Sequence, residues 1–197
     1  MLSFFLLIAV QASPPPTTIY VVRHAEKAAG DNPPLTQAGH ARAAALAAAL
    51  RDIELDAVFT TNLCRTAQTV APAARAAGLP LRMLRVADAD VEACAPRLAA
   101  KISWMDASDD AEQALVSALR GLPAGSHALV AGHSNTVPGL LEALGAPSLC
   151  PGTHPRDAEG HCWLPHQAYD DLFVVSLPGH GPARLQPLHY GTPTPVR

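Results

Sequence analysis

Residues 18–27, TIYVVRHAEK, form a short apolar run that ends abruptly in an arginine and a histidine. The run from Ile19 to Val22 is β-branched or aromatic, which is typical of a strand buried on both faces of a parallel sheet. In open α/β sheets, ligands bind in the crevice at the carboxyl ends of the strands. The stretch therefore predicts an α/β fold in which Arg23 and His24 face a ligand at that edge.

The rest of the chain alternates predicted strands with predicted helices. Strands are expected at 57–60, 81–86, 128–131, 172–177 and 184–188, the last two as a hairpin, and helices at 37–50, 63–77, 91–102, 111–119 and 136–144. Thr36 is expected to cap the first helix and Thr61-Asn62 the second. This alternation predicts a single α/β domain at 18–190, a three-layer αβα sandwich with a mostly parallel central sheet.

Length and charge limit the classes of partner. The chain has 197 residues, enough for one domain with a full core, and a net charge of -3. Its basic residues are scattered rather than clustered, so no nucleic-acid partner is expected. A small anionic substrate is the expected partner.

The two ends of the chain differ in composition from the domain. Residues 1–12, MLSFFLLIAVQA, resemble a signal peptide, and a proline-rich spacer follows at 13–17. This predicts a periplasmic or secreted protein. A cytoplasmic protein stays the alternative, because no Lys or Arg precedes the apolar run. The run is shorter than the roughly 20 residues that span a bilayer, so no stable membrane insertion is expected. Residues 191–197 are expected to form a disordered tail.

Four cysteines are compatible with disulfides in an exported protein. Cys150 and Cys162 flank a loop rich in glycine, proline and histidine and are the best candidate pair, whereas Cys64 and Cys94 lie in predicted helices as ordinary buried thiols. The loop also contains histidines that could complete a zinc site with its cysteines: His154, His161 and His166. Its spacing matches no standard zinc finger, so the disulfide is favoured and no metal is predicted.

Cationic and imidazole side chains follow three of the predicted strands. Arg23 and His24 follow the first, Arg65 lies in the helix after the second, and His133 follows the strand at 128–131. Parallel strands bring these ends to one edge. Two arginines and two histidines at one crevice would orient and neutralise a dianionic phosphoryl group.

Four motifs carry a family resemblance: RHAEK at 23–27, LTQAGHARA at 35–43, TTNLCRTAQT at 60–69 and VAGHSN at 130–135. In order and spacing they resemble the histidine phosphatase superfamily, which includes phosphoglycerate mutases. The resemblance implies a phosphohistidine mechanism in which His24 attacks phosphorus, Arg23 and Arg65 hold the phosphoryl oxygens and His133 donates to them. It implies a small phosphorylated substrate and no metal or other cofactor.

Further site residues are expected around this centre. Asp88 is the first choice for the acid that protonates the leaving group, since it is nearest the end of the third strand; Asp90 and Glu92 are alternatives that could equally be acids at a helix N-terminus. Lys27 is expected at the pocket rim, and Asn135 is expected either to bind phosphate or to cap the following helix.

The sequence therefore predicts a phosphomonoester hydrolase. A phosphoglycerate mutase-like phosphotransferase is the nearest alternative, weakened because residues 25–27 are Ala-Glu-Lys where the mutase signature continues with glycine. A non-catalytic protein that binds a phosphate ligand, or a metal-binding module on the cysteine-histidine loop, are the alternatives from other classes. Retention of both histidines favours catalysis, because a binder needs cations but no nucleophile.

Overall fold

The structure is a computed structural model that describes residues 13–91, 94, 98–105, 110–150, 156–158 and 160–194. The expected signal peptide at 1–12 lies outside the described residues. So do Glu92 and His154, the former an alternative proton donor and the latter a possible zinc ligand.

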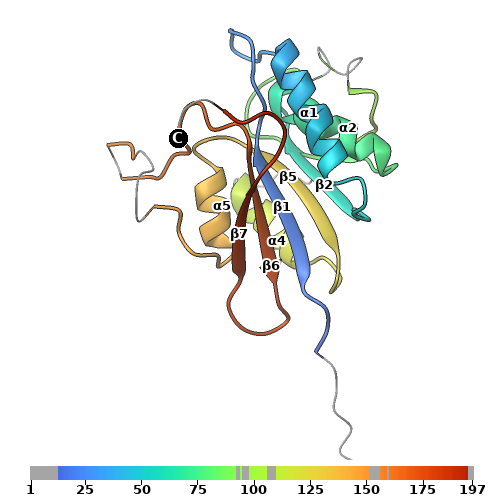
Figure 1. Cartoon of the computed structure of the whole chain (residues 1–197), viewed down its shortest axis with the longest axis vertical. Helices are drawn as coiled ribbons and strands as arrows, with labels where there is room; N and C mark the ends of the chain where they lie inside the picture. Colours follow the sequence, from blue (N-terminus) through green and yellow to red (C-terminus); the bar gives the residue numbers. More distant parts are fainter. Residues whose placement is uncertain are drawn as a thin grey trace, which may run out of the picture.

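Seven strands form one sheet in the order β4-β3-β2-β5-β1-β6-β7 (Figure 1). Their bounds are β1 Thr17–Arg23, β2 Ala57–Thr61, β3 Leu81–Leu84, β4 Ile102–Trp104, β5 His127–Gly132, β6 Asp171–Leu177 and β7 Arg184–His189. The first five strands pair in parallel, and β6 and β7 add an antiparallel hairpin beside β1. The mostly parallel sheet and the closing hairpin confirm the predicted fold class.

Helices cover both faces of this sheet. α1 Gln37–Ala49 and α2 Cys64–Ala76 lie on one face, and α4 Ala111–Arg120 and α5 Val137–Ala143 lie on the other (Figure 1). Each pair of helices encloses its own buried apolar cluster. The αβα sandwich therefore has two cores, one on each side of the sheet.

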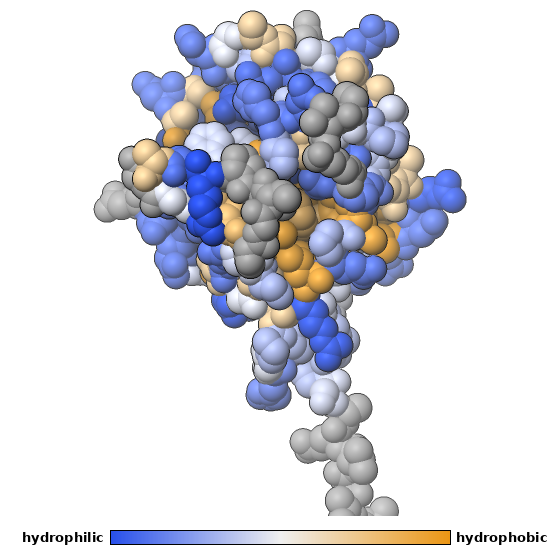
Figure 2. Space-filling model, turned by 60° about the vertical axis from the view of Figure 1, so that its left-hand side comes forward, coloured by the Kyte–Doolittle hydropathy of each residue, from blue (hydrophilic) through white to orange (hydrophobic). Residues whose placement is uncertain are grey.

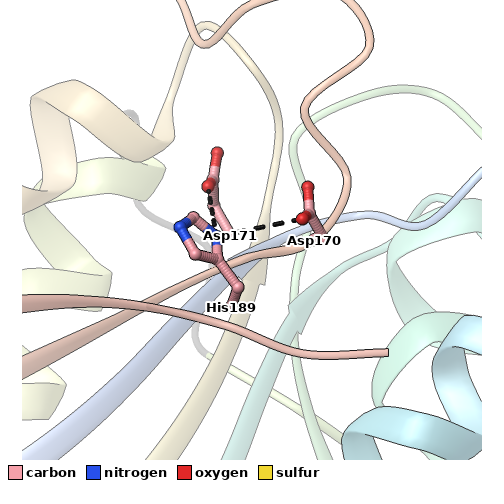
Figure 3. A group of neighbouring side chains, drawn as sticks. All are labelled: Asp170, Asp171 and His189. Atoms are coloured by element: carbon pink, nitrogen blue, oxygen red, sulfur yellow. Dashed lines mark ion pairs between the residues drawn. The ribbon is translucent and has the colours of Figure 1, made fainter. Parts of the chain in front are cut away.

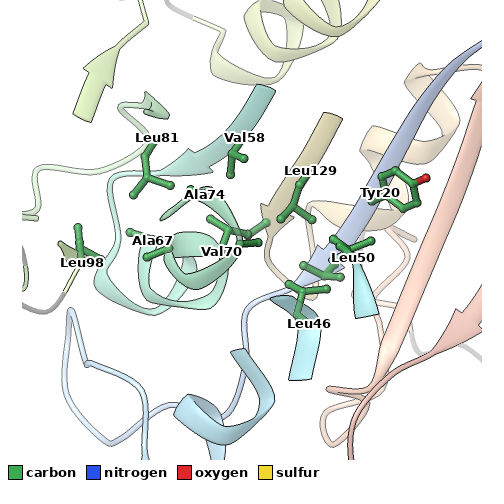
Figure 4. Close-up of a cluster of buried hydrophobic side chains, with 14 of the residues drawn as sticks. Tyr20, Leu46, Leu50, Val58, Ala67, Val70, Ala74, Leu81, Leu98 and Leu129 are labelled. Atoms are coloured by element: carbon green, nitrogen blue, oxygen red, sulfur yellow. The ribbon is translucent and has the colours of Figure 1, made fainter. Parts of the chain in front are cut away.

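The opening strand contributes to both cores. Tyr20 and Val22 belong to the cluster under α1 and α2, which Figure 4 shows, whereas Ile19 and Val21 belong to the cluster under α4 and α5. Successive side chains of a strand point to opposite faces, so a strand covered on both sides needs apolar residues at every position. This is the physical reason for the unbroken run at 19–22.

Two local predictions were wrong. Ile102 opens strand β4 on the edge of the sheet, in register with Leu81, instead of ending a helix that began at residue 91. The start of α2 is capped from a distant loop, since Cys64 N–H donates to Asn32 Oδ1 at 2.8 Å. Asn62 Oδ1 instead accepts from Val86 N–H, 2.9 Å away, and so holds the segment that follows β3.

The predicted cap of α1 is confirmed, and it also fastens the helix to the first strand's end. Thr36 Oγ1 accepts from Gly39 N–H at 3.1 Å, and Thr36 N–H donates to the Glu26 carbonyl at 2.9 Å. A Cβ atom on Gly39 would lie 2.1 Å from that same carbonyl oxygen. Only glycine lets α1 approach the backbone beside His24 this closely.

Both pairs of cysteines are joined in disulfides. Cys150 and Cys162 form the expected bridge, with 5.9 Å between their Cα atoms. Cys64 and Cys94 form a second bridge, with 5.8 Å between Cα atoms, so the prediction of ordinary thiols was wrong for them. The second bridge connects the start of α2 to the segment after β3, a contact between two elements that the sequence pattern does not reveal.

The ends of the domain are held by contacts. β1 begins directly after the exposed residues 13–16. In the expected tail, Thr192 O accepts from Arg42 Nη1, and Thr194 Oγ1 donates to Asp170 Oδ1. Residues 195–197 of that tail lie outside the described residues.

On the face drawn in Figure 2, mostly hydrophilic surface surrounds a smaller apolar area. Within the described residues, none of the helices has the length and apolar character to cross a bilayer.

Candidate active site

The register of β1 against β5 brings two histidines together. Arg23 pairs with Gly132 as the last residues of their strands, and His24 N–H donates to the Gly132 carbonyl at 2.9 Å. His24 and His133 are the residues that follow, and their ring centroids are 5.6 Å apart. The predicted meeting of these side chains at the carboxyl edge is confirmed.

His24 is a neutral imidazole with an assigned free nitrogen. The side chain is 3% exposed, and Nδ1 lies 2.8 Å from the Ala25 carbonyl oxygen. Because a carbonyl only accepts, Nδ1 carries the proton and Nε2 keeps its lone pair. Burial lowers the pKa of His24 to about 4, and the charges of Arg23 and Arg65 act in the same direction.

His133 is also neutral near pH 7. Burial lowers its pKa to about 3, with further lowering by Arg65 and by His24. Its Nε2 lies 3.1 Å from Thr61 Oγ1, which in turn lies 2.7 Å from Thr66 Oγ1. These hydroxyl groups fix the plane of the ring at the end of β2.

Arg23 is a buried cation and Arg65 a half-buried one, and both have unused donors. Arg23 Nη1 donates to the carbonyls of Pro165 and His166 at 3.1 and 3.0 Å, and its guanidinium lies 4.4 Å from the Tyr169 ring centroid. Within the described part of the chain, Arg23 Nε and Arg65 Nε are buried without a hydrogen-bond partner. A buried donor without a partner is costly, so this arrangement favours an anion between the two guanidinium groups.

The remaining motif residues hold the backbone around this centre. Ala25 N–H donates to Thr69 Oγ1 at 2.9 Å, and Thr69 Oγ1 donates to the Arg65 carbonyl at 2.7 Å. From the neighbouring position on α2, Gln68 Oε1 accepts from Leu35 N–H at 2.8 Å. α2 therefore fixes the loop after His24 as well as supplying Arg65.

Glu26 takes no part in the crevice and pairs with a neighbouring helix. Arg42 Nη2 lies 2.7 Å from Glu26 Oε1, and Arg42 Nε donates to the same carboxylate at 2.9 Å. The Arg42 side chain is 5% exposed, so this is a buried ion pair. It holds α1 against the chain directly after His24.

The outer predicted residues are less closely placed. Lys27 is exposed, but its charge contributes to the lowered pKa of His24. Asn135 is exposed and lines a cavity of about 310 Å³ that also contains Arg65 and His133. Asp88 is exposed after β3, and its neighbour Ala87 lines that cavity whereas Asp88 does not.

Two residues near the centre were missed. Tyr169 stacks on Arg23, and Glu112 lines the cavity from the first turn of α4. Burial, with Asp110 nearby, raises the pKa of Glu112. The available signal for Glu112 is an acid in the first turn of a helix that follows a strand. The sequence pattern predicts a helix where β4 begins, so this signal is hidden. Tyr169 comes from a loop and carried no signal.

One further group could hold a metal ion on geometric grounds. Asp170, Asp171 and His189 each offer one ligand atom within 4.8 Å of the others (Figure 3). His189 Nδ1 lies 3.1 Å from Asp171 Oδ1 and 3.9 Å from Asp170 Oδ2, so a protonated His189 forms an ion pair with each of the two carboxylates. Burial lowers the pKa of Arg23, and the negative charge of Asp171 partly opposes this shift.

Comparisons with known proteins agree with this arrangement. The model of the histidine phosphatase superfamily (branch 1) matches residues 19–86. A candidate phosphohistidine phosphatase, SixA, from Nakamurella multipartitia is 22% identical with a TM-score of 0.58, over 92% of this chain and 100% of that one. Ecdysone phosphate phosphatase from Bombix mori, in complex with tungstate, is 15% identical with a TM-score of 0.56, over 92% and 94% of the two chains.

A mycobacterial glucosyl-3-phosphoglycerate phosphatase is 15% identical with a TM-score of 0.54, over 89% of this chain and 98% of that one. A comparison with curated proteins finds no match. The structural likenesses show the fold, and the family model covers three of the four motifs recognised in the sequence. Over residues 19–86 the chain resembles the histidine phosphatase superfamily, and it shares its fold with these solved structures.

Proposed function

We propose that the protein hydrolyses phosphomonoesters through a phosphohistidine on His24. One observation supports this most: two guanidinium groups, whose buried Nε donors have no partner among the described residues, lie beside two imidazoles that are neutral near pH 7. The cations suit a phosphoryl dianion, and the free Nε2 of His24 suits a nucleophile. A protein that only binds phosphate has no need of that nucleophile.

In the first half of the reaction, His24 Nε2 attacks phosphorus and the bond to the leaving-group oxygen breaks. Arg23 and Arg65 take the charge that spreads over the phosphoryl oxygens. The Ala25 carbonyl keeps the proton on Nδ1 and stabilises the positive charge that the ring gains. Water then attacks the phosphohistidine, releases phosphate and regenerates the free imidazole.

The leaving-group oxygen takes up a proton as it departs. Asp88 is the proposed donor, as the acid closest to the end of β3, with Asp90 as the alternative among the described residues. Asn62 holds the backbone of this segment through its bonds to Val86 and Ala87. Lys27 and Asn135 are proposed to bind phosphate from the rim. These groups together supply the charge that the reaction needs, so we propose that it requires no metal ion.

The phosphatase names of the structural relatives agree with hydrolysis in preference to mutase activity. They include a candidate phosphohistidine phosphatase and a sugar-phosphoglycerate phosphatase. Two disulfides are compatible with an oxidising compartment, and we propose a periplasmic or secreted enzyme on this basis.

The test is hydrolysis of para-nitrophenyl phosphate, with and without EDTA, by the parent chain, His24→Asn and His40→Asn. His40 is an exposed histidine on α1 and serves as the matched control. We expect His24→Asn to lose about 1000-fold or more in rate, His40→Asn to match the parent, and EDTA to have no effect. Rapid quenching in alkali should capture one phosphoryl group on the parent, labile in acid. Turnover by His24→Asn at the parent rate would refute the covalent mechanism.

A further inference from the structure

The cavity beside the candidate active site has two chemically different ends. Arg65 and His133 lie at one end, where β2 and β5 finish, and Thr61 and Asn135 add polar groups there. The far walls come from α4, α5 and the segment around the end of β3. The cavity therefore continues the phosphate site into a space where the rest of a substrate would lie.

The far walls are mainly apolar. Leu84 and Val86 contribute from the end of β3, Leu115 from α4 and Leu140 from α5. Val86 is 45% exposed, so its side chain is accessible to a ligand in the cavity. Among the described lining residues, the charged side chains are Arg65 and Glu112.

Glu112 adds a negative group to this otherwise apolar region. Its Oε1 would lie 3.5 Å from a Cβ atom on Gly139, so the carboxyl group rests against α5, where glycine leaves room for it. A substrate with a second anionic group would meet this carboxylate, and the described residues of the far walls include no cation to offset it. A substrate with several hydroxyl groups would find few partners among the leucine and valine side chains.

We propose that this cavity binds the alcohol part of the phosphomonoester and selects an apolar alkyl or aryl group over a polyhydroxylated or anionic one. The proposal rests on the proposed function, since Arg65 and His133 are shared between the phosphate site and the cavity. Apolar contact with the walls raises kcat/KM by up to about fourfold for each methylene that leaves water. Glu112 and the leucine walls are specificity-determining residues for this reaction.

The experiment measures kcat/KM for n-alkyl phosphates from ethyl to hexyl, with glycerol phosphate and phosphoglycolate for comparison. Leaving-group basicity is nearly constant along the alkyl series, so the slope with chain length reports binding rather than chemistry. We expect a rise of about two- to fourfold per methylene in the parent, with phosphoglycolate the poorest substrate. Variants Val86→Thr and Leu115→Asn should flatten the slope, and Glu112→Gln should improve phosphoglycolate relative to ethyl phosphate.

Leu188→Thr is the matched control, because Leu188 is a similarly exposed aliphatic residue (39%) on β7, away from the cavity. It should keep the parent slope. The parent could show the same kcat/KM at every chain length and still form the His24 phosphoenzyme with para-nitrophenyl phosphate. That result would overturn the apolar selection and leave the proposed function intact. Equal slopes in the cavity variants and the parent would also overturn it. Failure to form the phosphoenzyme with any of these esters would overturn the proposed function and this inference together.

Discussion

Acidification should destabilise the domain through His24 and His133, the two histidines whose pKa the fold lowers. The pKa of His24 is about 4 and that of His133 about 3 in the folded chain, against about 6.5 for an unfolded histidine. Between pH 6.5 and pH 4 the unfolded state therefore binds more protons than the folded state. By linkage, the free energy of unfolding falls as the pH falls through this window.

The size of the effect follows from the pKa differences. At pH 5 the unfolded imidazoles are almost fully protonated and the folded ones almost fully neutral. Each pH unit between 6.5 and 5 then removes about 1.4 kcal/mol for each histidine, or about 2 kcal/mol per histidine over the interval. His24 and His133 together should account for about 4 kcal/mol, a large share of a typical domain stability.

The assay is urea unfolding followed by circular dichroism at pH 7 and pH 5 in phosphate-free buffer. The double variant His24→Asn/His133→Asn should lose less than half of the stability that the parent loses between these pH values. His40→Asn, the exposed control, should behave like the parent. An equal loss in the double variant and the parent would refute the assignment of two neutral buried imidazoles.

Four further perturbations test the packing and the chemistry. Glu26→Gln should lower the free energy of unfolding by about 3 kcal/mol in urea titrations, because it leaves a buried guanidinium unpaired; a loss below about 0.5 kcal/mol would contradict a buried ion pair. Gly39→Ala should cost at least about 2 kcal/mol, despite the higher helix propensity of alanine, because its methyl group meets a backbone carbonyl; a raised melting temperature would contradict the close approach. Cys64→Ala/Cys94→Ala should cost about 3 to 4 kcal/mol for a 30-residue separation, and unchanged stability relative to the oxidised parent would argue against the bridge. Asp88→Asn should slow esters of poor leaving groups about 100-fold and nitrophenyl phosphate much less, and equal effects on both would exclude an acid role.

Local sequence signals were enough to predict six of the seven strands and the edge of the sheet where His24 and His133 meet. The run at 19–22 is apolar because both faces of β1 are covered, and the residues after it can only lie at the carboxyl edge. Helix α1 was readable from its alanine content and its Thr36 cap, which acts within one turn. These features depend on neighbouring positions in the chain, which is why pattern and propensity sufficed.

The features that were missed depend on contacts between distant segments. β4 has only three residues and gains its hydrogen bonds from β3, so its pattern does not distinguish it from the end of a helix. The side chain that caps α2 belongs to Asn32, 32 positions before Cys64. The Cys64–Cys94 bridge likewise requires the packing of α2 against the segment after β3. A prediction from local patterns considers only neighbouring positions in the chain, so it cannot detect these contacts between distant segments.

The motifs are informative because most of their residues hold His24 in place rather than contact phosphate. Thr36 and Gly39 clamp α1 onto the Glu26 carbonyl, and Gln68 and Thr69 fasten the loop after His24 to α2. A nucleophile that must align with phosphorus tolerates little displacement, so its supporting contacts restrict the sequence as strongly as the reacting groups do. The cavity walls face a different requirement.

Among the described residues, no side-chain hydrogen bond joins Val86, Leu115 or Glu112 to the backbone beside His24 or to the two arginines. They can therefore vary with the leaving group while the phosphoryl site stays the same. This separation explains why the sequence motifs identify a superfamily and its chemistry without identifying a substrate. It also means that substrate preference should follow changes in α4 and in the segment after β3, whereas the motif at 23–27 should stay the same when the preference changes.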